Sequence, residues 1–251
     1  MSGPSGRKLV KQHFELRQTA VTMIAEKEHL ATGREAIFEA REIIERFIAS
    51  DSLFRDTLEP YDEPAKAHPL IKRMCDAARS AQVGPMAGVA GAIAEFSVQA
   101  MRENGADHAI VDNGGDIAIF LAEETDIGIY TMNPKFRGLG LRCHPSDSIL
   151  GICTSSGVIG PSISFGKADA ATVISKNVTL ADACATRLGN LITSDEDQII
   201  EGALDVVTNI EGIEGALVIV GDSIGAKGVL PELVNVKFSE EAVTGILFPD
   251  R

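Results

Sequence analysis

The sequence is short of positive charge. It carries 23 Lys and Arg against 36 Asp and Glu, which gives a formal net charge of −13 at pH 7. Nucleic acids and anionic membrane faces are bound through clustered Lys and Arg, so we expect neither as a partner. A phosphate-bearing ligand would need a local cation or a metal ion.

Long apolar runs and targeting signals are also missing. No run reaches the ~20 apolar residues that span a bilayer. The first six residues, MSGPSG, are small and polar, with no apolar segment behind them. They are typical of a frayed terminus and not of a signal peptide, so we expect a cytoplasmic protein.

Cysteine is scarce and scattered. The four cysteines, Cys75, Cys143, Cys153 and Cys184, form no CxxC pair, and no His lies at zinc-finger spacing. Free, buried thiols are the simplest interpretation. Cys143 and His144 together would need metal ligands from elsewhere, and the sequence names none.

The sequence does contain enough apolar residues for a substantial core. They make up 45% of the 251 residues, and no Pro/Gly/Ser-rich linker divides the chain. We therefore expect a single domain over residues 1–251.

Helical and strand patterns occur in blocks and do not alternate. Residues 14–25 predict one or two strands, and a helix follows over 32–50 with a capping box from Thr32 to Glu35. Further helices are predicted over 68–82, 83–105, 180–192 and 194–210, the last capped by Ser194. Strands are predicted over 108–111, 117–120, 126–131, 142–153, 168–175, 215–228 and 232–238. This segregation predicts an α+β fold with antiparallel sheets packed against helices.

The predicted helix LADACATRLGNLI carries one narrow polar stripe. Its apolar residues surround the helix axis, whereas Asp182, Thr186 and Asn190 recur every four residues along one face. A buried carboxylate must be paired, hydrogen-bonded or metal-bound, and Mg²⁺ combines one or two carboxylates with other oxygen donors. A Mg²⁺ site at Asp182 and Thr186 and a purely structural carboxylate are equal alternatives from this helix alone.

The segment DNGGD, residues 112–116, predicts a tight hairpin turn. The turn alone explains Asn-Gly, but two adjacent glycines also let the backbone approach a ligand closely. The residues that we expect to contact a ligand here are Asn113, Gly114, Gly115 and Asp116.

A hydroxyl-rich and glycine-rich stretch, CTSSGVIGPSISFGKADA, interrupts two apolar runs. Its hydroxyls and amides can hold an anion, and its apolar residues favour an ordered loop over a solvated linker. The predicted ligand contacts are Thr154, Ser155, Ser156, Gly157, Ser162, Ser164 and Gly166, and the candidate catalytic residues are Lys167, Asp169 and Cys153. Cys153 would become a thiolate if the Lys167 ammonium lay close to it.

Three glycines, Gly84, Gly88 and Gly91, lie near the start of the helix predicted over 83–105. Their spacing is not G-x-G-x-x-G, and no strand directly precedes them. Close packing of a helix against a sheet explains them better than a dinucleotide site.

Taken in order, the glycine-bearing helix, NGGDI, the TSG-like turn at 154–157 and ADACAT resemble the ApbE superfamily. Its members are flavin transferases that move FMN from FAD onto a protein threonine. The resemblance implies a T-fold-like architecture, with Asp182 and Thr186 holding Mg²⁺ beside the FAD pyrophosphate. With VGPMAGVAGAIAEF, CTSSG and SFGKADA added, the chain is similar over nearly its whole length to a small cytoplasmic branch of ApbE-like proteins in bacteria and archaea.

Two segments depart from the transferase pattern. Ala87-Gly88 or Ala90-Gly91 stands where transferases carry a Lys-Gly pair, and GPSISFGKAD replaces the His-Asp-Pro segment after the TSG turn. The absence of a signal peptide also differs from the exported transferases. These departures argue against FMN transfer and leave a related pocket for FAD, FMN or another phosphate-bearing ligand.

Two alternatives stay open. The branch is associated with sulfide assimilation toward homocysteine, so the resemblance also allows an accessory protein that uses a thiol such as Cys75 or Cys153. The other alternative is a non-catalytic T-fold module that acts through oligomer contacts, and under either interpretation we expect a homo-oligomer.

Overall fold

The computed structural model describes residues 8–16, 19–156 and 166–236, so the MSGPSG segment and Gly157, Ser162 and Ser164 lie outside the described residues. The strands are β1 (Leu9–Leu16), β2 (Thr19–Glu26), β3 (Ala109–Asn113), β4 (Asp116–Phe120), β5 (Thr125–Gly128), β6 (Leu139–Cys143), β7 (Leu150–Ser155), β8 (Ala170–Ser175), β9 (Ile213–Val220), β10 (Ser223–Gly228) and β11 (Glu232–Asn235). The helices are α1 (Leu30–Ser50), α2 (Leu53–Asp56), α3 (Pro69–Ala81), α4 (Val89–Glu103), α5 (Val178–Leu191) and α6 (Asp197–Thr208), with short 3-10 turns η1 (Pro85–Gly88) and η2 (Pro134–Phe136).

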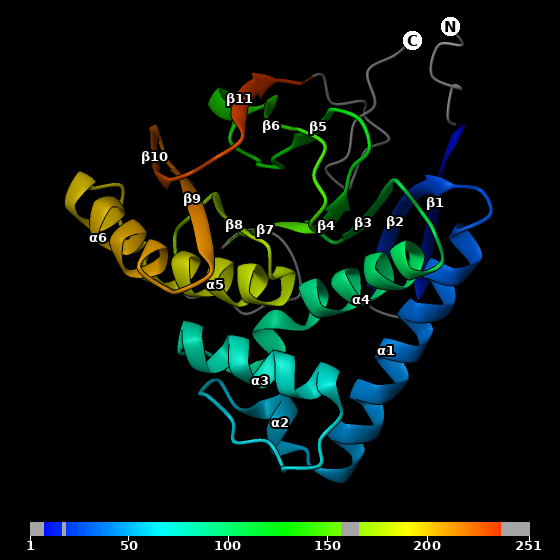
Figure 1. The fold of residues 1–251 in the computed structure, drawn as a ribbon. Coiled ribbons are helices and arrows are strands. Elements are labelled where there is room, and N and C mark those ends of the chain that lie inside the picture. Colours follow the sequence, from blue (N-terminus) through cyan, green and yellow to red (C-terminus); the bar gives the residue numbers. More distant parts are fainter. Residues whose placement is uncertain (1–7, 17–18, 157–165, 237–251) are drawn as a thin grey trace, which may run out of the picture.

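The strands form two antiparallel sheets. The larger sheet has eight strands in the order β1-β2-β3-β4-β7-β8-β9-β10, and the smaller has the order β11-β6-β5. The small sheet covers one face of the large sheet, and the helices cover the other face (Figure 1). The predicted α+β class with antiparallel sheets packed against helices is therefore confirmed.

Alternation of side-chain size along the large sheet separates two cores. Ile110, Ile117 and Ile119 point to the small sheet, where they pack with Ile127 and Leu141. On the opposite face the same strands present mainly smaller side chains to the helices, namely Ala109, Val111, Ala118, Cys153, Ala171, Val173 and Ala216. Because successive strand residues point to opposite faces, short side chains on one face let the helices approach that face closely.

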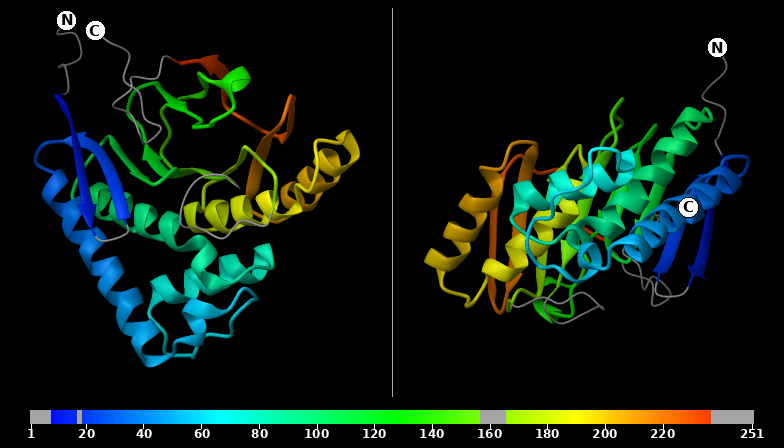
Figure 2. Two further views of the ribbon diagram at one scale, coloured as in Figure 1. Left: turned by 180° about the vertical axis from the view of Figure 1, so that it is seen from behind. Right: turned by 90° about the horizontal axis from the view of Figure 1, so that it is seen from below.

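Helices α4 and α5 lie in the middle of the helical layer, directly against the large sheet, and α3 lies behind them (Figures 1 and 2). Helix α5 is apolar around most of its circumference, as predicted, and ten of its residues are buried. Among the described residues, no helix is both long and apolar enough to cross a membrane.

Two predicted helix starts are wrong. Helix α1 begins at Leu30 with His29 as its N-cap and no side-chain cap hydrogen bond, so Thr32 and Glu35 lie inside the helix. Helix α6 is preceded by Glu196 as N-cap, and the Ser194 hydroxyl instead accepts a weak hydrogen bond from the Glu196 N–H at 3.4 Å. Glu196 has the extended backbone that is typical of an N-cap, whereas His29 already has helical backbone angles, so neither helix start follows the capping signal in the sequence.

The helix predicted over 83–105 is divided at Gly88 into η1 and α4. The prediction that its glycines pack a helix against a sheet is wrong. Gly88 and Gly91 pack against α5, and Gly84 packs against the backbone of Thr57 and Leu58. A Cβ at Gly91 would lie 2.7 Å from the Val178 oxygen and 2.8 Å from Asp182 Cβ, and one at Gly88 would lie 3.0 Å from the Thr179 oxygen. The first turns of α4 and α5 therefore touch through backbone atoms.

We expect Gly91→Ala to lower the free energy of unfolding by about 1–3 kcal/mol, because the added methyl group overlaps the first turn of α5. The matched control is Gly202→Ala on the exposed face of α6, where a Cβ meets nothing within 4 Å. That variant should be more stable by about 0.5–1 kcal/mol, since Ala favours helix over Gly. Urea denaturation measures both, and equal effects would contradict close α4–α5 packing.

Candidate functional site

The turn between β3 and β4 forms one side of the candidate site. Asn113 pairs with Asp116 across the turn, and Gly114 and Gly115 have φ angles of +72° and +102°. This confirms the predicted hairpin, since both central residues need positive φ. The Asn113 amide donates to the Ala90 oxygen at 3.1 Å and so ties the turn to the start of α4.

The end of β7 lies beside this turn. Cys153 is directly opposite Asp116 in the β4–β7 pairing, and the Thr154 N–H donates to the Gly115 oxygen at 3.2 Å. The Thr154 and Thr172 hydroxyls share a hydrogen bond at 2.9 Å, and Ser155 pairs with Ala171. The structure therefore brings together the turn residues and the first hydroxyls of the following stretch, as predicted.

Asp182 reaches the same place from α5. Its Oδ2 atom accepts a hydrogen bond of 2.7 Å from the Gly91 N–H, and its carboxyl group lies close enough to that of Asp116 for each to shift the pKa of the other. The Asp182 side chain is buried at 7% exposure, whereas Thr186, one helical turn further on, is partly exposed. The polar stripe predicted on α5 thus begins at a carboxyl pair and continues toward the surface.

The carboxyl groups of Asp116 and Asp182 both have a higher pKa than free aspartate. Burial raises the pKa of Asp182 to about 7, although hydrogen bonds from the Gly91 and Ala90 backbone act in the opposite direction. Burial also raises the pKa of Asp116 well above its ordinary value, and the nearby Asp182 and Asp112 carboxylates raise it further. The pair therefore binds a proton more readily than two separate aspartates, because two adjacent carboxylates that are poorly solvated repel each other.

A divalent cation fits this donor set. Asp116 and Asp182 supply carboxylate oxygens, and Thr186 supplies a hydroxyl group on the same face of α5, which suits an oxygen-preferring ion such as Mg²⁺. Within residues 8–16, 19–156 and 166–236, no three His, Cys, Asp or Glu side chains form a metal-binding group. Mg²⁺ needs only one or two carboxylates, with water, hydroxyl or phosphate oxygens at its other positions.

Cys153 lies within the site but is fully buried. Its Sγ donates to the Val178 oxygen at 3.6 Å, and burial, followed by the charges of Asp116 and Asp182, raises its pKa well above the ordinary value. The Lys167 side chain is exposed, and the backbone N–H of Lys167 donates to the Ile192 oxygen at 2.7 Å. The surroundings of Cys153 therefore favour a neutral thiol. All four cysteines are free and buried, as predicted.

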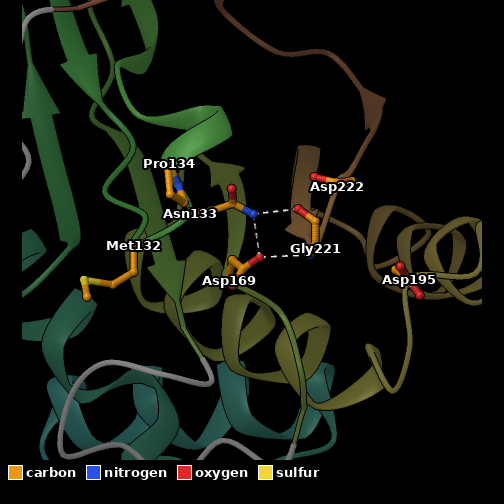
Figure 3. A pocket seen from close by; sticks show the side chains of 7 residues that line it. All are labelled: Met132, Asn133, Pro134, Asp169, Asp195, Gly221 and Asp222. Atoms are coloured by element: carbon orange, nitrogen blue, oxygen red, sulfur yellow. Dashed lines mark hydrogen bonds between the residues drawn. The ribbon is translucent and has the colours of Figure 1, made fainter.

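Asp169 is part of a different arrangement. Its Oδ2 atom accepts hydrogen bonds from the Asn133 amide at 3.0 Å and from the Gly221 N–H at 2.9 Å (Figure 3). It lines an open hollow of about 590 Å³ together with Met132, Asn133, Pro134, Asp195, Gly221 and Asp222. The structure thus does not bring Asp169 into the hydrogen-bonded cluster around Asp182.

Gly166 packs against the end of α5, where a Cβ would collide with the Gly189 carbonyl group. Gly91 was not predicted to contribute to the site, and Asp112, although part of the predicted DNGGD turn, was not among the predicted ligand contacts. Gly91 acts through its backbone N–H, and Asp112 accepts a hydrogen bond from the Gly115 N–H at 2.8 Å. A backbone donor leaves no sequence signal, whereas the acidic residue that precedes NGGD is visible and could have indicated the role of Asp112.

Comparisons with known proteins show the family and the fold of the chain. A protein-family model described as AbpE bacteria matches residues 4–220. The chain is 48% identical over 238 residues to the UPF0280 protein of Methanothrix thermoacetophila, which covers 94% of this chain and 99% of the relative.

Solved structures with a similar fold are distant in sequence. The ApbE protein of Thermotoga maritima has a TM-score of 0.59 at 13% identity, covering 92% of this chain and 97% of that one. The apo flavinyl transferase ApbE of Pseudomonas stutzeri has a TM-score of 0.57 at 13% identity, covering 88% of this chain and 94% of that one. At this identity the similarity concerns the fold.

We expect the carboxyl pair to make the protein less stable as pH rises from about 4 to 7. Unfolded aspartate loses its proton near pH 4, whereas folded Asp182 keeps its proton to about pH 7. Between these values folding requires proton uptake, and stability falls with increasing pH. Above pH 7 this contribution is fully lost.

Asp116→Asn should remove much of this pH dependence, because a neutral amide can donate to the Asp182 carboxylate. At pH 8 we expect the variant to be about 1–3 kcal/mol more stable than the wild type, with little difference at pH 5. Urea titrations at several pH values measure the effect, with Asp147→Asn, an exposed carboxylate, as control. Parallel stability curves for Asp116→Asn and wild type would rule out the coupled pair.

Proposed function

Because the chain belongs to the AbpE bacteria family, within the ApbE-like superfamily, we propose that it binds a flavin or another phosphate-bearing ligand with the help of Mg²⁺. The observation that carries the proposal is geometric: Asp116 of β4 and the buried Asp182 of α5 bring two carboxyl groups together. Their raised pKa values mean that this pair binds a proton readily. A cation that replaces this proton would relieve the repulsion between the two carboxylates and be held by them.

The proposed ligands of Mg²⁺ are Asp182 and Thr186, with Asp116 as a further carboxylate. When bound, the ion would neutralise charge on phosphate oxygens. The backbone N–H of Gly91 holds the Oδ2 atom of Asp182. Because this donor belongs to the backbone of α4, the orientation of the whole carboxyl group, including the oxygen that would bind the ion, is fixed. Such outer contacts orient a metal ligand and tune its affinity.

The phosphate-bearing part of the ligand would lie over the turn at Asn113–Asp116 and the end of β7. Gly114 and Gly115 have no side chain to obstruct it, and Thr154, Ser155 and Ser156 contribute hydroxyl and backbone groups to the same region. The net charge of −13 makes a cation necessary for this chemistry, because the protein as a whole repels anions.

We propose that this chain binds the ligand and does not transfer FMN. The structural relative from Pseudomonas stutzeri is a flavinyl transferase by name. In the resemblance described above, Ala87-Gly88 or Ala90-Gly91 stands where transferases carry Lys-Gly, and the Gly91 N–H is already used by Asp182.

The thiol-based alternative receives no support from the geometry. Cys75 and Cys153 are both fully buried, and burial is the main cause that raises the pKa of Cys75 to about 12. Rapid alkylation of either thiol in the native protein would favour that alternative.

Native mass spectrometry would test the proposed homo-oligomer and would also detect any retained nucleotide, flavin or metal.

We expect Asp182→Asn to fold normally and to weaken Mg²⁺-dependent binding of FMN or FAD by about 10- to 100-fold or more. The loss follows because an amide is a poorer and uncharged ligand for Mg²⁺. Isothermal titration calorimetry with FMN or FAD, with and without Mg²⁺, measures it.

The control for this experiment is Asp205→Asn, which removes an exposed carboxylate of α6 that pairs with Lys227 of β10. It has the same change in charge and should bind like the wild type. Unchanged Mg²⁺-dependent affinity in Asp182→Asn would refute the metal role.

A further inference from the structure

Glu95 is a buried carboxylate that lies outside the candidate site. It is located on α4 and is 6% exposed. Its Oε2 atom accepts hydrogen bonds from the Thr179 N–H at 3.1 Å and from the Thr179 hydroxyl at 2.9 Å. Its Oε1 atom pairs with the Arg73 guanidinium of α3 at 3.2 Å. One side chain thus connects three helices.

The Glu95 contact and the Asp182 contact lie one helical turn apart on the same pair of helices. On α4, Glu95 follows Gly91 by four residues, and on α5, Asp182 follows Thr179 by three, so each pair shares a helix face. The Gly91–Asp182 and Glu95–Thr179 hydrogen bonds therefore run in parallel across the α4–α5 contact. Two parallel cross-links oppose rotation of one helix against the other, which a single link does not.

Close contact between backbone atoms leaves little room for α5 to move relative to α4. The Val178 oxygen lies 2.7 Å from a Cβ position at Gly91 and accepts the Cys153 thiol hydrogen bond at 3.6 Å. A small rotation of the first turn of α5 would therefore separate Asp182 from the Gly91 N–H and also uncover Cys153.

We propose that Glu95 is a positioning residue that fixes the rotation of α5 and so directs the Asp182 carboxylate toward the ligand site. The inference rests on the proposed function for the role of Asp182 in binding, but the mechanical link does not depend on it. A buried ion pair is a weak source of stability compared with apolar packing. Its hydrogen bonds are directional, however, and they select one orientation of the helix.

The first test measures the link without any ligand. Native protein is alkylated with iodoacetamide, and the modification rate of each cysteine is followed by peptide mass spectrometry. In Glu95→Ala we expect Cys153 to react at least about tenfold faster than in the wild type. The variant lacks a charge-assisted hydrogen bond that local opening must break in the wild type, so opening costs less free energy. Cys143, which packs in the core between the two sheets, should react at its wild-type rate.

Matched variants separate positioning from general loss of stability. Glu95→Gln keeps an oxygen that accepts from Thr179 and should restore slow Cys153 alkylation. If Cys143 and Cys153 accelerate by the same factor, or if Cys153 is unaffected, the proposal is overturned. Should Glu95→Ala not fold, Thr179→Val removes only the hydroxyl hydrogen bond and should accelerate Cys153 by about threefold relative to Cys143.

The second test addresses the site itself, with Mn²⁺ alone as the probe and electron paramagnetic resonance as the readout. We expect Mn²⁺ to bind about tenfold more weakly to Glu95→Ala than to the wild type, and nearly normally to Glu95→Gln. Equal Mn²⁺ affinity in Glu95→Ala and the wild type would contradict the positioning role. If the wild type binds no Mn²⁺, the proposed function fails, and the alkylation rates still decide the role of Glu95.

Discussion

The hydrogen bond from the Gly91 N–H to Asp182 is the contact on which the arrangement of the site depends. It joins the first turn of α4 to α5 at the point where both helices meet the large sheet. The bond is possible only because residue 91 has no side chain, since a Cβ would overlap α5. It also offsets part of the cost of burying a carboxylate, because hydrogen bonds to a charged acceptor are stronger than neutral ones.

The large sheet makes this contact possible through the sizes of its side chains. Isoleucines fill the space toward the small sheet, whereas alanine and valine predominate on the helix-facing side. The short helix-facing residues bring α5 close enough for Asp182 to reach Asp116 on β4. The carboxyl pair, with its raised pKa values, therefore depends on the small side chains that separate the sheet from α5.

Much of the fold was predictable from local patterns. Periodicity identified most helices and strands, and the Asn113-Gly114 turn was confirmed by two positive φ angles. The predicted helix starts at Thr32 and Ser194 were wrong, since α1 already begins at Leu30 and α6 begins only after Glu196. Capping residues locate a helix end only to within a few residues. The glycines near residue 88 were correctly assigned to close packing, but their partner is α5 and not the sheet, since a glycine does not indicate what approaches it.

The sequence by itself determined the elements, the fold class and the presence of a polar stripe on an otherwise apolar helix, because these follow from the periods of helix and strand. Only the tertiary structure decided which polar groups meet. It placed Asp116 against Asp182, bound Asp169 to Asn133 and Gly221 beside an open hollow, and linked Glu95 to Thr179 across 84 positions of the chain. Such pairings depend on how the sheet is ordered and how closely the helices approach, and no local pattern of residues records those distances.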